Sequence, residues 1–363
     1  MSKLCVDGQL VYNNIVLMSA WQSMLQPAAC PPVKGGNHMP NLAYIGQVIA
    51  IYPIAGADRI ESLEVACGKG GHWRGTAQKA QFAVGDLCEV YLQDALLPQT
   101  ERFAFLEPRG WRVRMMRLKG VPSECLIMPR TELTDGLEAG ADITELAGVT
   151  KYEKLLPAQL AGDIRGRFPA FIPKTDEPNF QAAPAMVEAL QGKPFYATVK
   201  ADGSSGTVFW DEDGVVRACS RNYELKDGPD TAVWQLVRKY DLARQRLPVA
   251  LQFEIVGSGI QKNPMGLKEV DLRLFNIWQI DQRRYLDFDE MLALARSLEL
   301  PMVELVEIGD SFNLKDDEAL RQYAARTYAN GATAEGVVIR PLQETEVNGE
   351  RLSFKVINLL YRD

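Results

Sequence analysis

The spacing of hydrophobic and polar residues divides the chain into two parts that differ in structure. Between residues 40 and 147, short apolar stretches alternate with turn-forming residues, as in YIGQVIAIYPI, LEVACG and FAVGDLCEVYL, where Gly85-Asp86 marks a turn. The segment GWRVRMMRLKG alternates basic and apolar residues from Trp111, which is the period of a strand. Many short strands without a helical pattern predict a small closed barrel.

From about residue 181 the pattern changes to a mixture of helix and strand. Apolar residues recur at helical spacing in AAPAMVEALQG, TAVWQLVRKYDLARQRL and DFDEMLALARSLEL. Strands are expected in PFYATVK, LQFEIVG, DLRLFNIWQI, EGVVIRP and RLSFKVIN, and TVFW and VVRACS flank DEDG as a hairpin. The order of these segments predicts an α+β domain with antiparallel sheets and flanking helices.

Prolines and glycines suggest where the parts are joined. Residues 1–39 share no pattern with the rest, and PAACPPVKGGNHMP has the composition of a flexible linker. This segment is either an extension or lies upstream of a natural start at Met39, and a secretory signal is disfavoured because Asp7 interrupts its apolar stretch. We therefore expect an extension over 1–39, a barrel over 40–147, a proline-rich connection over 148–180, and the α+β domain over 181–363.

Composition excludes several classes of protein. The 363 residues are 47% hydrophobic, which is enough for two domain cores, and no apolar run approaches the roughly 18 residues that span a bilayer. The six cysteines are widely separated and there are two histidines. A disulfide framework or a structural zinc site is therefore not expected. We expect reduced thiols and a cytoplasmic location. Chemistry must then come mostly from Lys, Arg, Asp and Glu.

Charge is unevenly distributed along the acidic chain. The net charge is −7, yet the segment 101–130 carries three acids among the basic residues Arg102, Arg109, Arg112, Arg114, Arg117, Lys119 and Arg130. This excess is consistent with a surface that faces phosphates, and equally with a solvated strand face.

Four of the strands expected in the second half carry one ionisable residue among apolar neighbours: Lys200, Glu254, Glu335 and Lys355. A charge on a central strand is costly to bury unless it meets a partner, so the two lysines and two glutamates predict a shared polar pocket. Lysines suit an anionic substrate, and carboxylates, including Asp202, suit a hard divalent cation. Phosphoryl or nucleotidyl transfer uses both, and because no P-loop motif occurs, Lys200 is the candidate nucleophile.

The residues around these positions resemble the motifs of the covalent nucleotidyltransferases, the superfamily of nucleic-acid ligases and mRNA capping enzymes. Lys200-Ala201-Asp202-Gly203 matches the first motif, K-x-D-G. The later motifs are matched in order by SRN at 220–222, FEIVG at 253–257, EGVVI at 335–339 and SFKVIN at 353–358. K-x-D-G alone is weak, whereas five ordered elements over about 160 residues are specific.

The flanking sequence is most similar to that of ATP-dependent RNA ligases of family five, which have an N-terminal OB domain. The similarity covers residues 40 to 363 and includes FIPKTDEPNFQ at 171–181 and GSGIQKNPMGLKEVDLRLFNIW at 257–278. DNA ligases and capping enzymes instead carry an OB barrel after the fifth motif. The chain departs from its relatives at Pro178-Asn179, where an arginine is frequent, and at Ile357, where many have a second lysine.

The resemblance implies an OB-like β-barrel followed by a nucleotidyltransferase domain. It implies that Lys200 takes AMP from ATP, that AMP passes to a 5′-phosphate end, and that a 3′-hydroxyl then displaces it. Lys355 would lie near Lys200, and both the desolvation of Lys200 and a neighbouring cation favour its neutral amine. The implied catalytic residues are Lys200, Glu254, Glu335 and Lys355; the implied nucleotide contacts add Asp202, Gly203, Arg221, Phe275 and Val338, and Asp202, Glu254 and Glu335 would hold Mg²⁺ or Mn²⁺.

The expected partner is RNA or a nicked duplex that contains RNA, the expected state is a monomer, and no membrane is involved. Three alternatives remain open: a DNA ligase, a capping enzyme that uses GTP, and an RNA-binding OB protein with an inactive transferase domain. Phe275 is expected either to stack on adenine or to be an ordinary core residue.

Overall fold

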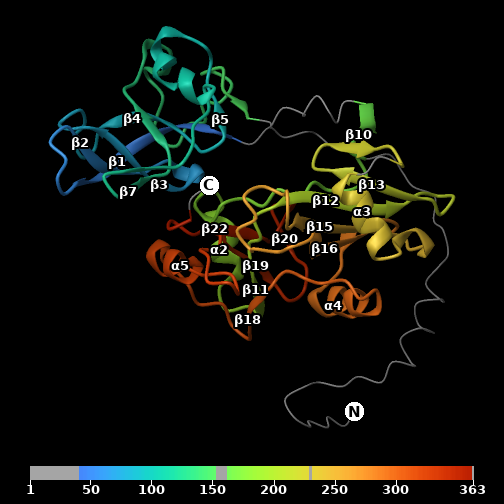
Figure 1. The fold of residues 1–363 in the computed structure, drawn as a ribbon. Helices are drawn as coiled ribbons and strands as arrows, with labels where there is room; N and C mark the ends of the chain where they lie inside the picture. The colour runs from blue at the N-terminus through green and yellow to red at the C-terminus, as the bar shows by residue number, and fades with distance from the viewer. Residues whose placement is uncertain (1–40, 153–161, 229–230, 362–363) are drawn as a thin grey trace.

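The computed structural model describes residues 41–152, 162–228 and 231–361, which form a β-barrel and a larger α+β domain (Figure 1). The extension expected over 1–39 lies outside the described residues. Within the part of the chain that is described, no helix is long and apolar enough to cross a membrane.

The N-terminal domain is a nearly closed antiparallel barrel, as the sequence predicted. Its five-stranded antiparallel sheet has the order β3-β2-β1-β4-β8. An isolated parallel bridge between Gly75 of β3 and Cys125, the residue before β8, brings the two edges of this sheet together. Its strands are β1 (Ala43–Pro53), β2 (Ile60–Ala66), β3 (His72–Gln78), β4 (Leu87–Tyr91) and β8 (Leu126–Met128). Its short pairs are β5 (Ala95–Leu96) with β9 (Thr150–Lys151) and β6 (Met116–Leu118) with β7 (Val121–Ser123), and its 3-10 turns are η1 (Gly68–Gly70), η2 (Glu101–Arg109) and η3 (Glu132–Thr134).

The four described cysteines are buried and free, as expected for reduced thiols: Cys67, Cys88, Cys125 and Cys219.

The alternating basic segment does not form the strand face that its pattern predicted. Trp111 has a left-handed backbone with φ of 61°, which interrupts an extended run, and only β6 of this segment is strand. Two of its arginines contact protein groups: Arg112 pairs with Asp94, and Arg117 donates to the carbonyls of Gly120 and Leu359. Upstream of the segment, Arg102 contacts the buried Glu89 at 2.7 Å. Part of the basic charge of this region is therefore paired within the protein.

The larger domain contains two antiparallel sheets. The seven-stranded sheet has the order β10-β14-β13-β12-β15-β16-β17. Its strands are β10 (Ile164–Arg167), β12 (Ser204–Trp210), β13 (Val216–Ser220), β14 (Tyr223–Leu225), β15 (Val249–Val256), β16 (Asp271–Gln279) and β17 (Arg284–Tyr285). Helices α3 (Ala232–Lys239) and α4 (Phe288–Ser297) pack their apolar faces into its core. Helix α3 is shorter than its pattern predicted because Asp241 turns left-handed before the 3-10 turn η6 (Leu242–Arg244).

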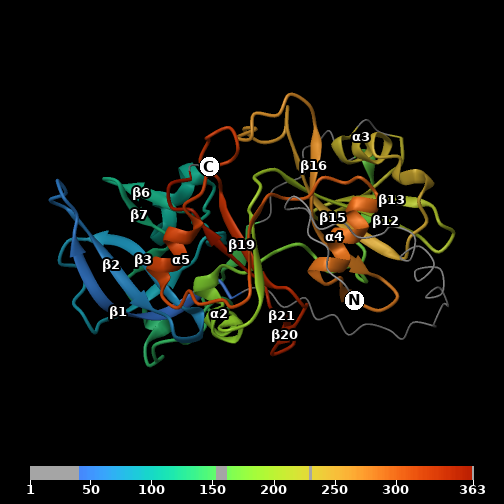
Figure 2. The same cartoon turned by 90° about the horizontal axis from the view of Figure 1, so that it is seen from below.

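The smaller sheet has four strands in the order β18-β11-β19-β22. They are β18 (Leu305–Gly309), β11 (Phe195–Val199), β19 (Gly336–Pro341) and β22 (Phe354–Ile357), with a separate hairpin of β20 (Glu346–Val347) and β21 (Glu350–Arg351). Its core includes residues of the 3-10 turn η5 (Phe180–Ala182), α2 (Pro184–Leu190) and α5 (Asp317–Ala324), and α5 was not predicted from the sequence. Figure 2 shows α2 and α5 on the side of the domain that faces the barrel.

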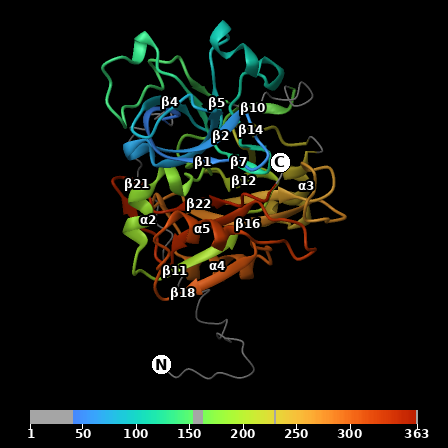
Figure 3. The ribbon, with the colours of Figure 1, turned by 90° about the vertical axis from the view of Figure 1, so that its left-hand side faces the viewer.

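A buried ion pair joins the two domains. Arg321 of α5 donates to both carboxylate oxygens of Glu124 in the barrel, at 2.7 and 3.0 Å, and each side chain is 7% exposed. Gln181 donates to the same carboxylate at 3.3 Å and to the carbonyl of His72 at 3.0 Å. The barrel therefore lies directly on α5 and η5 (Figure 3).

Candidate active site

The link between the two sheets carries the predicted nucleophile. The chain leaves the smaller sheet at the end of β11, passes through Lys200 to Gly203, and enters the larger sheet at the start of β12. Apolar residues fix both ends of this link, because all of β11 is buried and β12 is buried from Gly206. Lys200 therefore stands where the two sheets meet.

Glu335 is the direct partner of Lys200. The ammonium Nζ lies 2.6 Å from a carboxylate oxygen of Glu335, and the Lys200 backbone N–H donates to the Gly336 carbonyl at 2.9 Å. Both contacts follow from the pairing of β11 with β19, in which Val199 lies opposite Val337. The pairing of these two strands thus places Lys200 of the first motif beside Glu335 of the fourth.

Lys355 and Val338 lie on the next strands of the same sheet. Val338 of β19 is opposite Thr198 on one side and Lys355 of β22 on the other. The N–H of Lys355 donates to the Pro178 carbonyl at 2.8 Å, which fixes the strand against the segment before η5. Burial and the positive charge of Lys200 lower the pKa of Lys355.

Glu254, Asp202 and Gly203 approach from the larger sheet. Glu254 of β15 is opposite Ser205 of β12, two residues after Gly203. A Cβ on Gly203 would lie 2.2 Å from the Ile255 carbonyl oxygen and 2.9 Å from the Glu254 Cγ. Only glycine therefore allows the link to pass this close to β15.

The acids form one electrostatic cluster around Lys200. Burial, together with the nearby Glu335 and Asp202 and against the opposing charge of Lys200, raises the pKa of Glu254 to about 8. Burial lowers the pKa of Lys200, yet the nearby Glu335, Glu254 and Asp202 outweigh it and leave the pKa raised. In the protein without a metal ion, desolvation therefore does not make Lys200 neutral, because three carboxylates surround the amine.

Arg221 and Phe275 differ in exposure to solvent and in the kind of partner they contact. The Arg221 side chain is 57% exposed and pairs with Asp176. Phe275 on β16 is half-buried and packs against a small cluster that includes Ala201 and Val256. It thus lies beside the Lys200 link, where both interpretations of this residue, adenine stacking and core packing, stay open.

Several residues at the site were not predicted from the sequence. The Tyr328 hydroxyl donates to the Lys200 carbonyl and accepts from the Asp202 N–H, both at 3.1 Å, and the Tyr361 hydroxyl donates to the Asp202 carboxylate. Behind the site, Glu177 accepts from Arg340 at 2.6 Å. Glu177 belongs to FIPKTDEPNFQ, a segment that resembles RNA ligases but for which no site residue was predicted, whereas the two tyrosines carry no motif.

Oxygen donors at the site suit a hard divalent cation. Burial raises the pKa of Glu254, and the nearby Glu335 and Asp202 raise it as well, although Lys200 opposes them. Over the described ranges, no three Asp, Glu, His or Cys side chains converge closely enough to ligate one ion directly. These acids therefore fit a Mg²⁺ or Mn²⁺ that keeps much of its water shell.

Comparison with known proteins identifies the two domains separately. A model of the RNA ligase family matches residues 193–357, and a model of an OB-fold domain matches residues 42–130. The comparison with curated protein sequences finds no match.

Solved structures of Naegleria gruberi RNA ligase resemble the whole two-domain chain. The apo form of one variant has a TM-score of 0.74 and 30% sequence identity, and the match covers 88% of this chain and 96% of that one. A variant with ATP and Mn has a TM-score of 0.74 and 31% identity, covering 87% and 97%, and the ligase with PPi has the same TM-score and identity, covering 88% and 97%. Since the identity reaches 30% over nearly the full length of both proteins, the chain belongs to the RNA ligase family.

Proposed function

We propose that this protein is an ATP-dependent RNA ligase that joins a 3′-hydroxyl end to a 5′-phosphate end through AMP bound covalently to Lys200. The observation that carries the proposal is the position of Lys200, 2.6 Å from Glu335 and beside Glu254 and Asp202 at the meeting of two sheets. A half-buried lysine among acids can be charged before ATP binds, and its neutral amine can act as a nucleophile once the proton is removed.

The first step forms a bond between Lys200 Nζ and the α-phosphorus of ATP and breaks the bond to pyrophosphate. Before attack the ammonium loses a proton, and the Glu335 carboxylate is the group placed to take it. A bound Mg²⁺ or Mn²⁺, held by Asp202, Glu254 and Glu335 mainly through water, would supply positive charge that offsets these acids and the phosphate oxygens. Lys355 adds a second positive charge on the neighbouring strand.

In the next two steps AMP passes from Lys200 to the 5′-phosphate of an RNA end, and a 3′-hydroxyl then attacks that phosphorus and releases AMP. Phe275 is assigned to the adenine, Gly203 and Val338 to the walls of the nucleotide site, and the exposed Arg221 to a phosphate. The similar Naegleria gruberi RNA ligase has been solved with ATP and Mn, with AMP and Mn and with PPi, which supports ATP as the substrate and a divalent cation as its partner here.

We further propose that the substrate is a nick whose 3′-hydroxyl strand is RNA, and that the protein acts as a cytoplasmic monomer. The proposed domain limits are 40–147 for the OB domain, 148–180 for the connection and 181–363 for the adenylation domain. Sealing assays on nicks that pair RNA and DNA strands in each combination test the substrate. Equal sealing of an all-DNA nick would favour a DNA ligase instead.

Lys200→Ala tests the nucleophile. The wild type incubated with ATP labelled at the α-phosphate and Mn²⁺ should acquire an acid-stable AMP label, and Lys200→Ala should acquire none, because no other described lysine is assigned the nucleophile's role. Lys193→Ala, which removes an exposed lysine of the same domain, is the matched control and should label normally. A label on Lys200→Ala equal to that of the wild type would overturn the assignment, and preference for GTP would indicate capping chemistry.

A further inference from the structure

The segment after β22 returns to the active site and ends against Asp202. Asn358 is 1% exposed; its backbone N–H donates to the Glu335 carbonyl at 2.9 Å, and its side-chain amide donates to the Ala334 carbonyl at 3.0 Å. The N–H of Tyr361 then donates to the Asn358 carbonyl at 3.0 Å. Arg117 of the barrel donates to the Leu359 carbonyl, so that both domains hold this segment.

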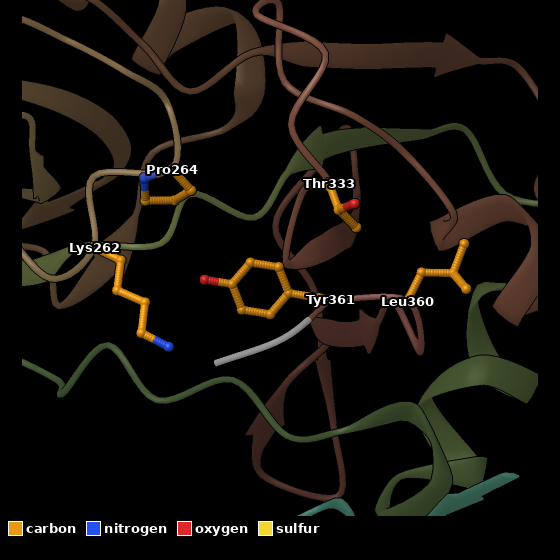
Figure 4. A pocket seen from close by; sticks show the side chains of 5 residues that line it. All are labelled: Lys262, Pro264, Thr333, Leu360 and Tyr361. Atoms are coloured by element: carbon orange, nitrogen blue, oxygen red, sulfur yellow. The ribbon is translucent and has the colours of Figure 1, made fainter. Parts of the chain in front are cut away.

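The ring of Tyr361 stands at the edge of an open groove. The groove has a volume of about 310 Å³ and is lined by Lys262, Pro264, Thr333, Leu360 and Tyr361. Figure 4 shows the Tyr361 hydroxyl directed into the space toward Lys262 and Pro264 rather than back into the domain core. The same hydroxyl donates to the carboxylate of Asp202.

A second tyrosine fixes the backbone on which Asp202 stands. Tyr328 is 3% exposed, and its single hydroxyl binds the Lys200 carbonyl and the Asp202 N–H, which flank Ala201. Its ring packs with Val199 and Ala334, the residues that precede Lys200 and Glu335. Tyr328 thus sets the direction of the backbone, while Tyr361 sets the direction of the Asp202 side chain.

We propose that Tyr361 is a positioning residue that aims the Asp202 carboxylate at the hydrated metal ion, with Tyr328 holding the backbone beneath it. This inference rests on the proposed function, because it assumes that a divalent cation binds beside Lys200. A carboxylate that holds an ion through water needs a fixed direction, and a hydrogen bond to its second oxygen supplies one. The groups that face Asp202 in this arrangement include Tyr361, Tyr328, Lys200 and the acids of the cluster.

The test is the conservative variant Tyr361→Phe, which removes one hydroxyl and keeps the ring. Binding of Mn²⁺ to the protein with AMP, followed by the electron paramagnetic resonance signal of free Mn²⁺, should weaken about tenfold, the lower end of the effect of removing a group that orients a metal ligand. The Mn²⁺ concentration that gives half-maximal labelling of Lys200 should rise by the same factor, while the unfolding temperature stays that of the wild type.

The matched control is Tyr323→Phe, which removes a hydroxyl that donates to the Glu307 carboxylate at 2.8 Å elsewhere in the same domain. The Mn²⁺ affinity of this variant should equal that of the wild type. Wild-type Mn²⁺ affinity in Tyr361→Phe would overturn the proposal, as would labelling lowered equally at every Mn²⁺ concentration. Faster labelling or tighter Mn²⁺ binding would also overturn it, because Tyr361 would then obstruct Asp202. A wild type that takes up no AMP would instead overturn the proposed function on which the inference rests.

Discussion

Glu177, in the segment FIPKTDEPNFQ that resembles RNA ligases, stabilises the strand that leads out of the active site. Its carboxylate accepts from Arg340 at 2.6 Å and lies 3.8 Å from Arg351, and the Arg340 side chain is 2% exposed. Burial raises the pKa of Glu177, and the two guanidinium groups more than offset this, so the pKa is lowered and the carboxylate stays charged. Arg340 belongs to β19, the strand that begins after Glu335, so this pair fixes the strand that carries the partner of Lys200.

Glu177→Gln should lower the free energy of unfolding at pH 7 by about 3 to 5 kcal/mol, because it leaves a buried guanidinium without its counter-charge. Since the folded pKa lies below the unfolded value of about 4.3, the contribution is complete above that pH and is lost as the pH falls through the folded pKa. Urea unfolding at pH 7, 5 and 4 measures the difference, which should shrink on acidification. Glu350→Gln, an exposed acid of the same domain, is the control, and a difference that grows toward pH 4 would contradict the assignment.

The sequence predicted the charged residues of the site because each interrupts an otherwise apolar strand. Lys200, Glu254, Glu335 and Lys355 are recognisable one strand at a time, and their order matches known motifs. Tyr328 and Tyr361 could not be predicted in this way, since their partners on the Lys200 link lie 126 and 159 residues away and no local pattern marks them. The raised pKa of Lys200 was also missed, because it depends on the distances between acids of different strands.

At the scale of elements, the site depends on how closely β12 approaches β15. The link at Gly203 has no room for a side chain, since a Cβ would meet the backbone carbonyl of Ile255 at 2.2 Å. A methyl group cannot be accommodated by rotating a flexible neighbour here, because the obstructing atom belongs to the main chain. The two strands must therefore separate locally, at the positions of Asp202 and Glu254.

Gly203→Ala should thus reduce Lys200 labelling by at least about a hundredfold, the loss expected when reacting groups are displaced by about an ångström. Gly166→Ala, on the edge strand β10 where nothing lies within 4 Å of the new Cβ, is the matched control and should label at the wild-type rate. The initial rate of AMP incorporation distinguishes the two variants. Comparable rates for both would show that the strands tolerate the separation.

Helix α5 shows the limit of prediction for elements. Its buried residues are Leu320, Arg321 and Ala324, and one of the three is an arginine, so its sequence lacks a continuous apolar face. The helix is stabilised by contacts with β22 and by the ion pair to the barrel, which the local sequence does not reveal. Helices α2, α3 and α4 and the strands that carry the four charged site residues or adjoin them were predicted because their apolar pattern is complete within the element.

At the scale of the whole molecule, the barrel and the adenylation domain should unfold as a coupled unit. Arg321→Met leaves Glu124 buried without its charge partner and should cost about 3 to 5 kcal/mol, whereas Glu124→Gln/Arg321→Met should recover most of the loss. Calorimetry should show one transition for the wild type and two for Arg321→Met. Asp241→Asn, which breaks an exposed pair with Arg244, should change stability by no more than about 0.5 kcal/mol.

If Arg321→Met kept a single transition at the wild-type temperature, the pair would not couple the domains. If the double variant were as unstable as Arg321→Met, loss of the buried charge partner would not be the cause. The comparison of the single and double variants thus separates charge burial from simple loss of packing.

The ion pair between Glu124 and Arg321 also affects how a polynucleotide would engage the enzyme. Because the OB surface and the adenylation site are already fixed to each other, a strand that touches one is presented to the other at a high effective concentration. Binding of the strand therefore does not have to restrict a motion between the two domains, and no conformational entropy of the protein is lost for that reason. That entropy was already lost when the chain folded.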